Sequence, residues 1–385
     1  MITLRSAHDP RDTRIDLLRG IAILVVMLLH FSLTYRLTQS QLANWFTPQL
    51  VRALVINGNY GVTIFFAISG FLITSNSLRR AGTLGQIDVR KFYAYRFARI
   101  MPTLVLALFA IVVPGCLGLP SFANAAHGQP LPASYFVLAI VSVLTFWHNV
   151  LMQSVGYFNY CLNIYWSLSV EEIFYLALPL AGVLLGRTSL FVALCLALVV
   201  AGPFYRWMHA DNELFFMYGY WACFDAIALG CLTALLKNHF VLSRARNRAM
   251  TFTGAIALAA TYFTGISGHE VLGFSAVALS TSILLLTSSP LPRADWSSAR
   301  VVQPLRWLGR HSYELYLFHI VVLALMRNLV PREALSYAMK LPWLVLFLAF
   351  SSVVAGTVSH FFSEPANQAL RRYLSTARPI PAAQA

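Results

Sequence analysis

The sequence is poor in charged residues. They make up 11% of its 385 residues, whereas a soluble protein carries about 25%. Hydrophobic residues make up 58% of the chain, and the mean hydropathy is +0.66. These values exclude an ordinary water-soluble domain and predict an integral membrane protein.

Acidic residues are scarcer than basic ones, with 14 acids against 28 bases and a net charge of +14. In a soluble chain this excess would suggest a nucleic-acid partner. Here the basic residues lie in stretches between apolar runs, as in the cytoplasmic loops of membrane proteins. The charge therefore indicates topology, and we expect the membrane rather than nucleic acid as a partner.

The chain also lacks paired cysteines. None of its five cysteines forms a CxxC pair, and most lie in apolar segments. This pattern predicts neither a disulfide framework nor a zinc site, and no other metal site is expected. The first apolar run follows Asp9, Asp12 and Asp16, and no small-residue cleavage site follows the run, so we expect no cleavable signal peptide.

Long apolar runs recur along the chain and predict an all-α, polytopic membrane fold of about ten transmembrane helices. The runs are Asp16–Tyr35, Asn59–Leu78, Arg99–Leu119, Ile164–Leu185, Ser189–Tyr205, Gly219–Lys237, Met250–Ser267, Val271–Thr287, Ser312–Val330 and Leu341–Phe362. An eleventh run, Tyr135–Gln153, is interrupted by Trp147, His148 and Asn149. The polar interruption makes it ambiguous as a span.

Positive charge sets the expected orientation, because cytoplasmic loops are enriched in Lys and Arg. Arg79–Arg99 holds six basic residues, Lys237–Arg248 holds four, and the Arg206–Tyr218 loop carries acids and should face out. With the basic loops and Arg187 inside, Tyr135–Gln153 cannot cross once and should be re-entrant or interfacial. Both termini are then expected in the cytoplasm.

No internal repeat or long soluble insertion is visible. Residues 1–374 are therefore expected to form one membrane domain. Residues 375–385 are rich in Pro and Ala and are expected to be a disordered tail.

The first apolar run, RIDLLRGIAILVVMLLHFSLTY, carries the polar residues Asp16, Arg19 and His30. Arg19 and His30 are eleven residues apart, about three turns and roughly 16 Å, so they point to nearly the same face. An ionisable residue inside a lipid-spanning helix is costly and is kept mostly for function. The alternative is a histidine hydrogen-bonded between packed helices.

Two carboxylates are expected at the depth of His30. Glu171 and Asp225 fall, like His30, within roughly 7 to 11 Å of the outer boundary of their spans. Three ionisable groups at one depth predict a shared polar cavity for proton transfer, with His30 as base and a carboxylate orienting its ring. An interhelical salt bridge is the alternative for Glu171 and Asp225.

A basic cluster is expected at the cytoplasmic boundary, formed by Arg19, Arg90, Lys91, Arg96 and Arg99. Arg96 and Arg99 are three residues apart and would share a helix face. Arginine binds phosphates through two parallel hydrogen bonds, so the cluster predicts a phosphate-bearing ligand. The alternative, charge that serves only topology and lipid headgroup contact, is sufficient for Arg79–Arg80.

These segments together resemble the acyltransferase-3 family of membrane acyltransferases. The family pattern of an Arg and a His separated by ten residues matches Arg19 and His30. The other matching segments are Phe65–Thr74 (FFAISGFLIT), Arg96–Pro102, Trp166–Tyr175 (WSLSVEEIFY), FDAIALG around Asp225, and Ser312–His319 (SYELYLFH). The resemblance extends over most of the chain.

The resemblance implies an activity and roles for several residues. Members move an acyl group, often acetyl from acetyl-CoA, onto hydroxyls of envelope polysaccharides, peptidoglycan, lipids or small molecules. By this resemblance His30 would be the essential catalytic histidine, Arg19, Arg96 and Arg99 would help to hold the donor, and Glu171 would be functionally important. Many relatives carry a C-terminal esterase-like domain; none is expected here, so a second catalytic step would need another protein.

We therefore expect an O-acyltransferase of the cell (inner) membrane, with acetyl-CoA or another acyl-CoA as donor and an envelope glycan hydroxyl as acceptor. Ser69, Trp166, Tyr313 and His319 are the candidate substrate contacts. At Ser69 helix packing is the alternative, and at His319 a structural hydrogen bond. Other functions left open are a lipid or small-molecule acceptor, a transmembrane acyl shuttle, and a secondary transporter; the missing repeated halves argue against the last. The oligomeric state is not predicted.

Overall fold

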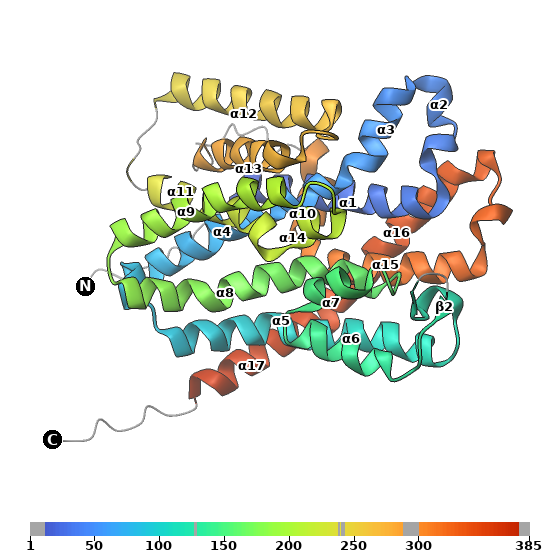
Figure 1. Cartoon of the computed structure of the whole chain (residues 1–385), viewed down its shortest axis with the longest axis horizontal. Coiled ribbons are helices and arrows are strands. Elements are labelled where there is room, and N and C mark those ends of the chain that lie inside the picture. The colour runs from blue at the N-terminus through green and yellow to red at the C-terminus, as the bar shows by residue number, and fades with distance from the viewer. Residues whose placement is uncertain (1–11, 127–128, 238, 240–242, 288–299, 377–385) are drawn as a thin grey trace.

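The computed structural model is an almost entirely helical bundle of long, side-by-side helices (Figure 1). It describes residues 12–126, 129–237, 239, 243–287 and 300–376. Among these, the strands are limited to β1 (Ala125–Ala126) and β2 (Gln129–Pro130), which pair antiparallel. The predicted all-α class is confirmed. Of the predicted tail, residues 375 and 376 belong to the last helix, and residues 377–385 lie outside the described part.

Ten long helices occupy the ten predicted spans. They are α1 (Thr13–Tyr35), α4 (Tyr60–Ala81), α5 (Val89–Cys116), α8 (Trp166–Leu185), α9 (Thr188–Met208), α11 (Tyr220–Lys237), α12 (Arg244–Thr264), α13 (Glu270–Thr287), α15 (Ser312–Leu329) and α16 (Lys340–Val358).

The shorter helices connect or extend these spans. They are α2 (Leu42–Trp45), α3 (Pro48–Ile56), α6 (Tyr135–Leu144), α7 (His148–Val155), α10 (Glu213–Tyr218), α14 (Gln303–Arg310), a π-helical turn (Ser359–Ser363) and α17 (Glu364–Thr376).

Eight helical segments of the described chain are long and apolar enough to cross a membrane by length and composition. The two remaining long helices are α12 and α15, of 21 and 18 residues. Basic residues at the start of α12, and Glu314, His319 and Arg327 within α15, lower their hydropathy. Both pack along neighbouring spans, α12 on α13 and α15 on α16, so the chain is a multi-pass membrane protein.

Helix α5 begins ten residues before the predicted start of the third span at Arg99. Its N-cap is Asp88, whose side chain accepts a hydrogen bond of 2.9 Å from the backbone N–H of Lys91. This cap stabilises a first turn that lies beyond the apolar run. The basic residues Lys91, Arg96 and Arg99 therefore lie on a rigid helix rather than in a loop.

The eleventh apolar run does not form one crossing helix. It is divided into α6 and α7 by a turn at residues 145–147, where Phe146 has a φ of 63°. The ten residues of α6 extend only about 15 Å, half the thickness of the hydrocarbon core. The two short helices pack on each other and on α8. The segment therefore is not one crossing helix, as expected, and its re-entrant or interfacial position stays a prediction.

Close helix crossings hold the centre of the bundle together. A Cβ added at Gly70 of α4 would overlap the carbonyl oxygen of Ile227 of α11, and one at Gly230 would overlap that of Ala67. The two helices therefore pack backbone to backbone, as small residues permit in membranes. Helix α1 lies against α4, α14 and α15, which places Arg19 and His30 inside the bundle.

The bundle has two ends that are used below. The inner end carries Arg80, Lys91 and Arg371, which line one cavity. The outer end carries α2, α3 and α10, at the opposite ends of the long helices (Figure 1).

The hairpin between α8 and α9 offers a test of the expected orientation. It turns at Gly186 and Arg187, at the inner end of the bundle. A single cysteine placed at Arg187, in a chain whose other cysteines are replaced, should react with a membrane-impermeant maleimide only after the cells are opened. Labelling of intact cells would place the inner end outside and contradict the orientation.

Candidate functional site

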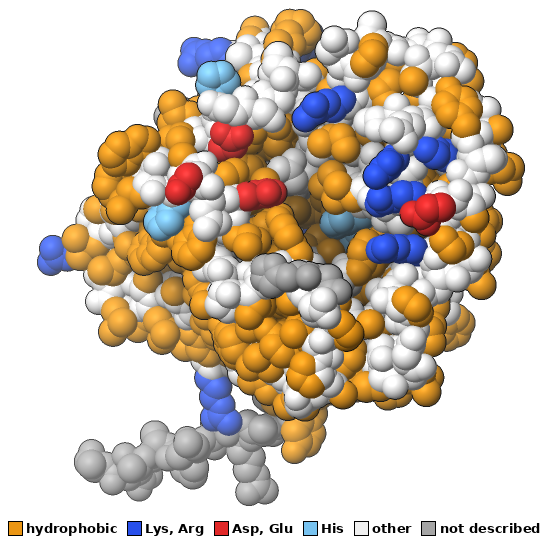
Figure 2. Space-filling view, turned by 45° about the vertical axis from the view of Figure 1, so that its right-hand side comes forward, with side chains coloured by type: hydrophobic (Ala, Val, Ile, Leu, Met, Phe, Trp, Pro, Cys, Tyr) orange, Lys and Arg blue, Asp and Glu red, His pale blue; other side chains and the backbone are white. Residues whose placement is uncertain are grey.

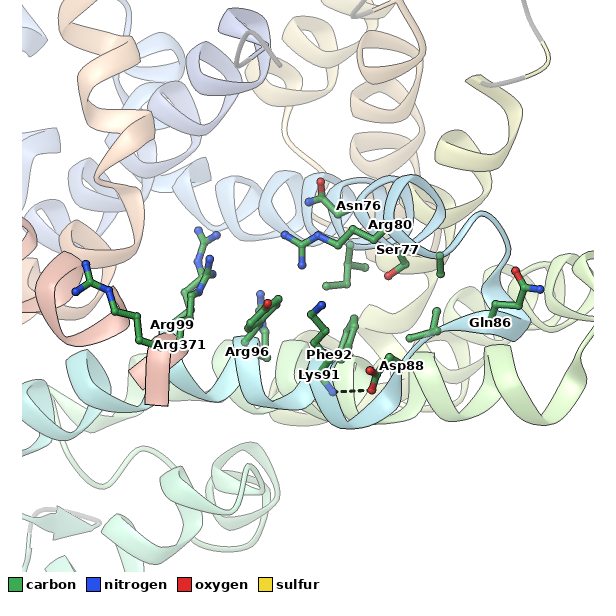
Figure 3. Close-up of a pocket in the computed structure, with 15 residues that line it drawn as sticks. Asn76, Ser77, Arg80, Gln86, Asp88, Lys91, Phe92, Arg96, Arg99 and Arg371 are labelled. Atoms are coloured by element: carbon green, nitrogen blue, oxygen red, sulfur yellow. Dashed lines mark hydrogen bonds between the residues drawn. The ribbon is translucent and has the colours of Figure 1, made fainter. Parts of the chain in front are cut away.

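A large basic cavity opens at the inner end between α4, α5 and α17. Its volume is about 790 Å³. Six cations line it, with Asp88 as the acidic residue among its lining side chains (Figure 3). The cations are Arg80, Lys91, Arg96, Arg99, Arg371 and Arg372. Such an excess of arginine in a concave site suits a ligand with several phosphate oxygens.

A smaller chamber of about 170 Å³ continues from the basic cavity into the bundle. The two share Ile73, Asn76, Arg96 and Arg99, so Arg96 and Arg99 lie where one opens into the other. The polar residues of the chamber are Arg19, Ser69, Asn76, Arg96, Arg99, Ser167, Glu171, Glu172, Tyr175, Ser312, Tyr313 and Tyr316. Of the predicted cluster, Arg19, Arg96 and Arg99 therefore lie around one continuous space, and Lys91 lies in its wide part. Arg90 lines neither cavity.

Arg96 is held in place by α8. Its Nη2 lies 2.9 Å from Oε1 of Glu172 and 3.6 Å from Oε1 of Glu171, and its guanidinium lies 3.5 Å from the ring centre of Tyr175. The Tyr175 hydroxyl donates a hydrogen bond of 2.5 Å to Glu171, and Ser69 contacts both. Glu171 thus helps to hold Arg96 where the two cavities meet and does not pair with His30.

Arg19 and Arg99 complete the narrow part of the space. The Arg19 guanidinium donates to the Ser312 hydroxyl, over 3.1 Å from Nε and 2.8 Å from Nη2. Arg99 lies near Arg19 and Arg96, and its guanidinium makes no hydrogen bond within the described part of the chain. Because Arg99 lies near two other cations and hydrogen-bonds to neither Glu171 nor Glu172, its guanidinium is the best-placed group here for an incoming anion.

His30 forms a pair with His319 on α15. Nδ1 of His30 lies 2.8 Å from Nε2 of His319, and the rings are stacked with centroids 5.0 Å apart. Nδ1 of His319 lies 2.8 Å from the carbonyl oxygen of Leu315. A carbonyl only accepts, so the proton of neutral His319 is on Nδ1 and its Nε2 is an acceptor.

The tautomer of His30 follows from this arrangement. Because His319 Nε2 accepts, the proton of neutral His30 is on Nδ1, and its Nε2 carries a lone pair. That nitrogen is the group in the pair that can take a proton from a hydroxyl. The ring of Tyr316, which lines the chamber, lies 6.0 Å from that of His319. The His30–His319 pair therefore sits next to the end of the chamber without lining it.

Polar groups continue from His30 to the outer end of α1. Thr34 donates to the carbonyl of His30 over 2.9 Å, and its hydroxyl lies 2.5 Å from that of Tyr160. Burial raises the pKa of Tyr160, so the phenol stays protonated. Arg327 lies 5.2 Å from its ring centre. In Figure 2, turned to bring the outer end forward, acidic side chains gather to the left of a central hollow and basic ones to its right, with an acidic side chain among them.

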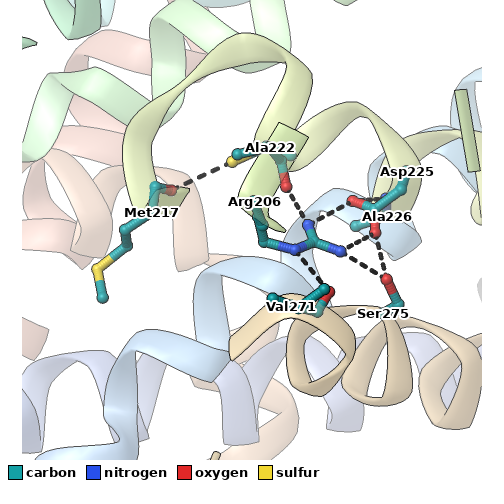
Figure 4. A network of polar contacts seen from close by, with 8 residues as sticks. Arg206, Met217, Ala222, Asp225, Ala226, Val271 and Ser275 are labelled. Carbon is teal, nitrogen blue, oxygen red and sulfur yellow. Dashed lines mark hydrogen bonds and ion pairs between the residues drawn. The ribbon is translucent and has the colours of Figure 1, made fainter. Parts of the chain in front are cut away.

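Asp225 does not join His30 or Glu171. Its carboxylate pairs with Arg206, Oδ2 to Nη2 at 2.7 Å, and accepts a bond of 2.6 Å from Ser275 (Figure 4). Arg206 and Asp225 are 0% and 1% exposed, so this is a fully buried ion pair. Gly202 permits it, because a Cβ there would lie 2.6 Å from Cγ of Asp225. The expected cavity shared by His30, Glu171 and Asp225 is therefore wrong, because Asp225 pairs with Arg206 instead.

The expected loop at Arg206–Tyr218 needs a related correction. Helix α9 extends to Met208, so Arg206 lies in its last turn and points inward. Its Nε donates to the carbonyl of Val271 over 3.0 Å, and Nη1 donates to that of Ala222. Its charge suggested that Arg206 lies in a loop. In the last turn of α9, however, its side chain reaches the buried carboxylate of Asp225.

The candidate substrate contacts divide into two groups. Ser69 and Tyr313 line the chamber, where Tyr313 donates to the carbonyl of Ile100 over 2.9 Å. His319 supports His30. Trp166 lines neither cavity and packs edge-on against Phe66 and Tyr218, with ring centres 6.0 and 4.6 Å apart. Trp166 thus has packing contacts only.

Several residues of the site were missed in the sequence. Glu172 is the nearer carboxylate to Arg96, and its side chain is 6% exposed against 27% for Glu171. Glu171 and Glu172 lie at almost the same depth but point about 100° apart around the helix, so depth alone could not show which of them meets Arg96. Tyr175 could have been found, because it lies four residues after Glu171 and residues at that spacing share a helix face. Arg371 could not have been assigned to the site, because it lines the cavity only when α17 packs back onto α5.

Comparisons with known proteins agree on one family. A family model described as an acyltransferase domain matches residues 12–361. O-acetyltransferase OatA of Staphylococcus aureus is 24% identical over 357 residues, covering 84% of this chain and 53% of the relative. Peptidoglycan O-acetyltransferase OatA of Listeria monocytogenes is 25% identical over 342 residues, covering 81% and 49%.

A third relative is the putative peptidoglycan O-acetyltransferase YrhL of Bacillus subtilis, 25% identical over 346 residues, covering 83% of this chain and 50% of the relative. The chain thus spans about half the length of these curated relatives. No solved structure matches it.

Proposed function

Because the chain belongs to the acyltransferase-3 family, we propose that it is a membrane O-acyltransferase that moves acetyl from cytoplasmic acetyl-CoA to a hydroxyl of an envelope glycan. The names of the relatives support the reaction and the class of acceptor. The expected orientation, with both termini in the cytoplasm of a cell (inner) membrane, puts the donor on the inner side and the acceptor on the outer side.

One observation carries this proposal: the basic cavity narrows at Arg96 and Arg99 into a chamber that ends beside the His30–His319 pair. Coenzyme A has phosphates at one end and a thioester at the end of a long, flexible arm. Phosphates held by the arginines would direct that arm along α1, whose rise from Arg19 to His30 is about 16 Å. Binding energy from the phosphate end would thus position the thioester.

The proposed chemistry uses the lone pair on Nε2 of His30. This nitrogen takes the proton of the acceptor hydroxyl as the hydroxyl oxygen attacks the thioester carbon. The carbon–sulfur bond then breaks, and the leaving thiolate receives the proton from the His30 imidazolium. Nε2 of His319 accepts a hydrogen bond from Nδ1–H of His30 throughout and keeps the ring in the orientation that presents Nε2. The ester product and free coenzyme A balance the reaction.

Loss of O-acetyl groups from the envelope glycan is the direct test. Acetate released by mild alkali from purified glycan should fall when the gene is deleted and return when it is restored. An unchanged glycan with a lost lipid or small-molecule ester would reassign the acceptor. Acetyl transfer that continues without the chain would contradict the proposal.

Arg99→Gln tests the donor site. We expect the KM for acetyl-CoA to rise about 10- to 100-fold with little change in kcat, because a charge-assisted hydrogen bond to phosphate is worth about 1.5–3 kcal/mol. The measurement is acetyl transfer or thioester cleavage by the purified protein at varied acetyl-CoA.

Arg187→Gln is the matched control, since Arg187 lies at the same end, is exposed and lines neither cavity. It removes one positive charge from the inner end. An equal change in both variants would mean that Arg99 acts only through the general charge of this face.

A further inference from the structure

The C-terminal helix α17 lies beyond the residues that match the family model, yet it forms a wall of the basic cavity. The match ends at residue 361, and α17 runs from Glu364 to Thr376. Arg371 and Arg372 from this helix line the cavity. Figure 3 shows Arg371 reaching into it from α17. A π-helical turn at Ser359–Ser363 leads into α17, which packs along α5. Helix α17 therefore adds cations to the site from outside the matched residues.

Three of the cavity's cations surround one aromatic ring. The guanidinium of Arg371 lies 5.2 Å from the ring centre of Tyr95, that of Arg80 lies 5.5 Å away, and Nζ of Lys91 lies 5.8 Å away. They come from three different helices, α17, α4 and α5. Nε of Arg371 is buried and has no hydrogen-bond partner among the described residues. We call these four residues the Tyr95 cluster.

The Tyr95 cluster is separate from the cations at the entrance of the chamber. Arg96 and Arg99 line both spaces, whereas Tyr95, Arg80, Lys91 and Arg371 line only the wide cavity. Lys91, Tyr95 and Arg99 follow each other at four-residue spacing and so lie on one face of α5. Along this face Lys91 and Tyr95 line the wide cavity, and Arg99 lies at the entrance of the chamber. The cations therefore form two groups, those of the Tyr95 cluster and the pair Arg96 and Arg99.

We propose that the Tyr95 cluster binds the adenosine 3′-phosphate end of coenzyme A, with the 3′-phosphate on Arg371 and Arg80 and the adenine against the Tyr95 ring. This inference rests on the proposed function, because it names how the donor is recognised. Coenzyme A carries two anionic groups separated by a ribose, the pyrophosphate and the 3′-phosphate, which matches two groups of cations. Arginine suits a phosphate monoester, and a tyrosine ring offers a stacking surface for a base.

The decisive experiment compares two donors that differ by one phosphate. Acetyl-CoA and acetyl-dephospho-CoA are assayed with the purified full chain, its Arg371→Gln variant and the Arg187→Gln control. In the wild type, removal of the 3′-phosphate should raise the KM about 10- to 100-fold. Arg371→Gln should raise the KM for acetyl-CoA similarly and leave that for acetyl-dephospho-CoA within about twofold. The control should behave as the wild type with both donors.

Equal weakening with both donors would assign Arg371 to the packing of α17 and overturn the inference. So would an Arg371→Gln variant that matches the wild type with acetyl-CoA. A loss that is restored only by vesicles of anionic phospholipid would show that the cluster binds lipid phosphate, and would overturn it as well.

A binding measurement separates this inference from the proposed reaction. Adenosine 3′,5′-bisphosphate and adenosine 5′-monophosphate are titrated into the detergent-purified chain by calorimetry. The bisphosphate should bind at least tenfold more tightly, and Arg371→Gln should remove the difference. That result without any acetyl transfer would reject the proposed function and keep the nucleotide site. Acetyl transfer with equal binding of the two nucleotides would reject the site and keep the function.

Discussion

His30→Ala is expected to lower acetyl transfer by about 10²- to 10⁴-fold, the range typical of a lost general base. The reason is the tautomer fixed by His319 and the Leu315 carbonyl, which leaves Nε2 of His30 as the available base. The readouts are glycan O-acetyl content in cells and thioester cleavage by the purified protein. Donor affinity should not change, because His30 lines neither cavity.

His319 provides the matched comparison. His319→Gln retains an oxygen that can accept a hydrogen bond from Nδ1–H of His30. His319→Ala leaves that N–H without a hydrogen-bond partner in a buried site. We therefore expect kcat to fall about tenfold or more in the Ala variant, with partial recovery in the Gln variant. Full activity in His30→Ala, or equal loss in both His319 variants at unchanged stability, would contradict the roles assigned to this pair.

Asp225→Asn is expected to lower the free energy of unfolding by about 3–5 kcal/mol, because it leaves the guanidinium of Arg206 buried without its counter-charge. The pair is fully buried, and Ser275 and two backbone carbonyls satisfy its remaining groups. The measurement is thermal or denaturant unfolding of the purified protein in detergent, with the yield of folded protein as a second readout.

The double variant Arg206→Met, Asp225→Leu is the control. Replacement of both charges by apolar side chains of similar volume should recover most of the lost stability, since neither charge is then left alone. Activity per folded molecule should be close to that of the wild type. If Asp225→Asn instead keeps its stability and loses activity as His30→Ala does, the carboxylate has the catalytic role that its depth suggested.

The depth of a side chain along its helix follows from the sequence, whereas the side chains that it contacts follow from how the helices pack. Hydropathy and charge were enough to predict the all-α bundle, the positions of its long helices and the absence of a single crossing helix over α6–α7. They also placed Arg96 and Arg99 together, because residues three apart on one helix share a face whatever the helix packs against. The roles assigned to His30, Glu171 and the arginines stay predictions.

Arg19 and His30 are the clearest case of what the sequence by itself determined. Their spacing put both on one face of α1, and that result is a property of a single helix. Which groups they meet is a property of the bundle. Ser312 and His319 reach them from almost 300 residues away along the chain, and Asp225 turns to Arg206 instead. Depth fixes one coordinate of a side chain, whereas the rotation and neighbours of each helix are set by packing, so only the tertiary structure could choose the partners.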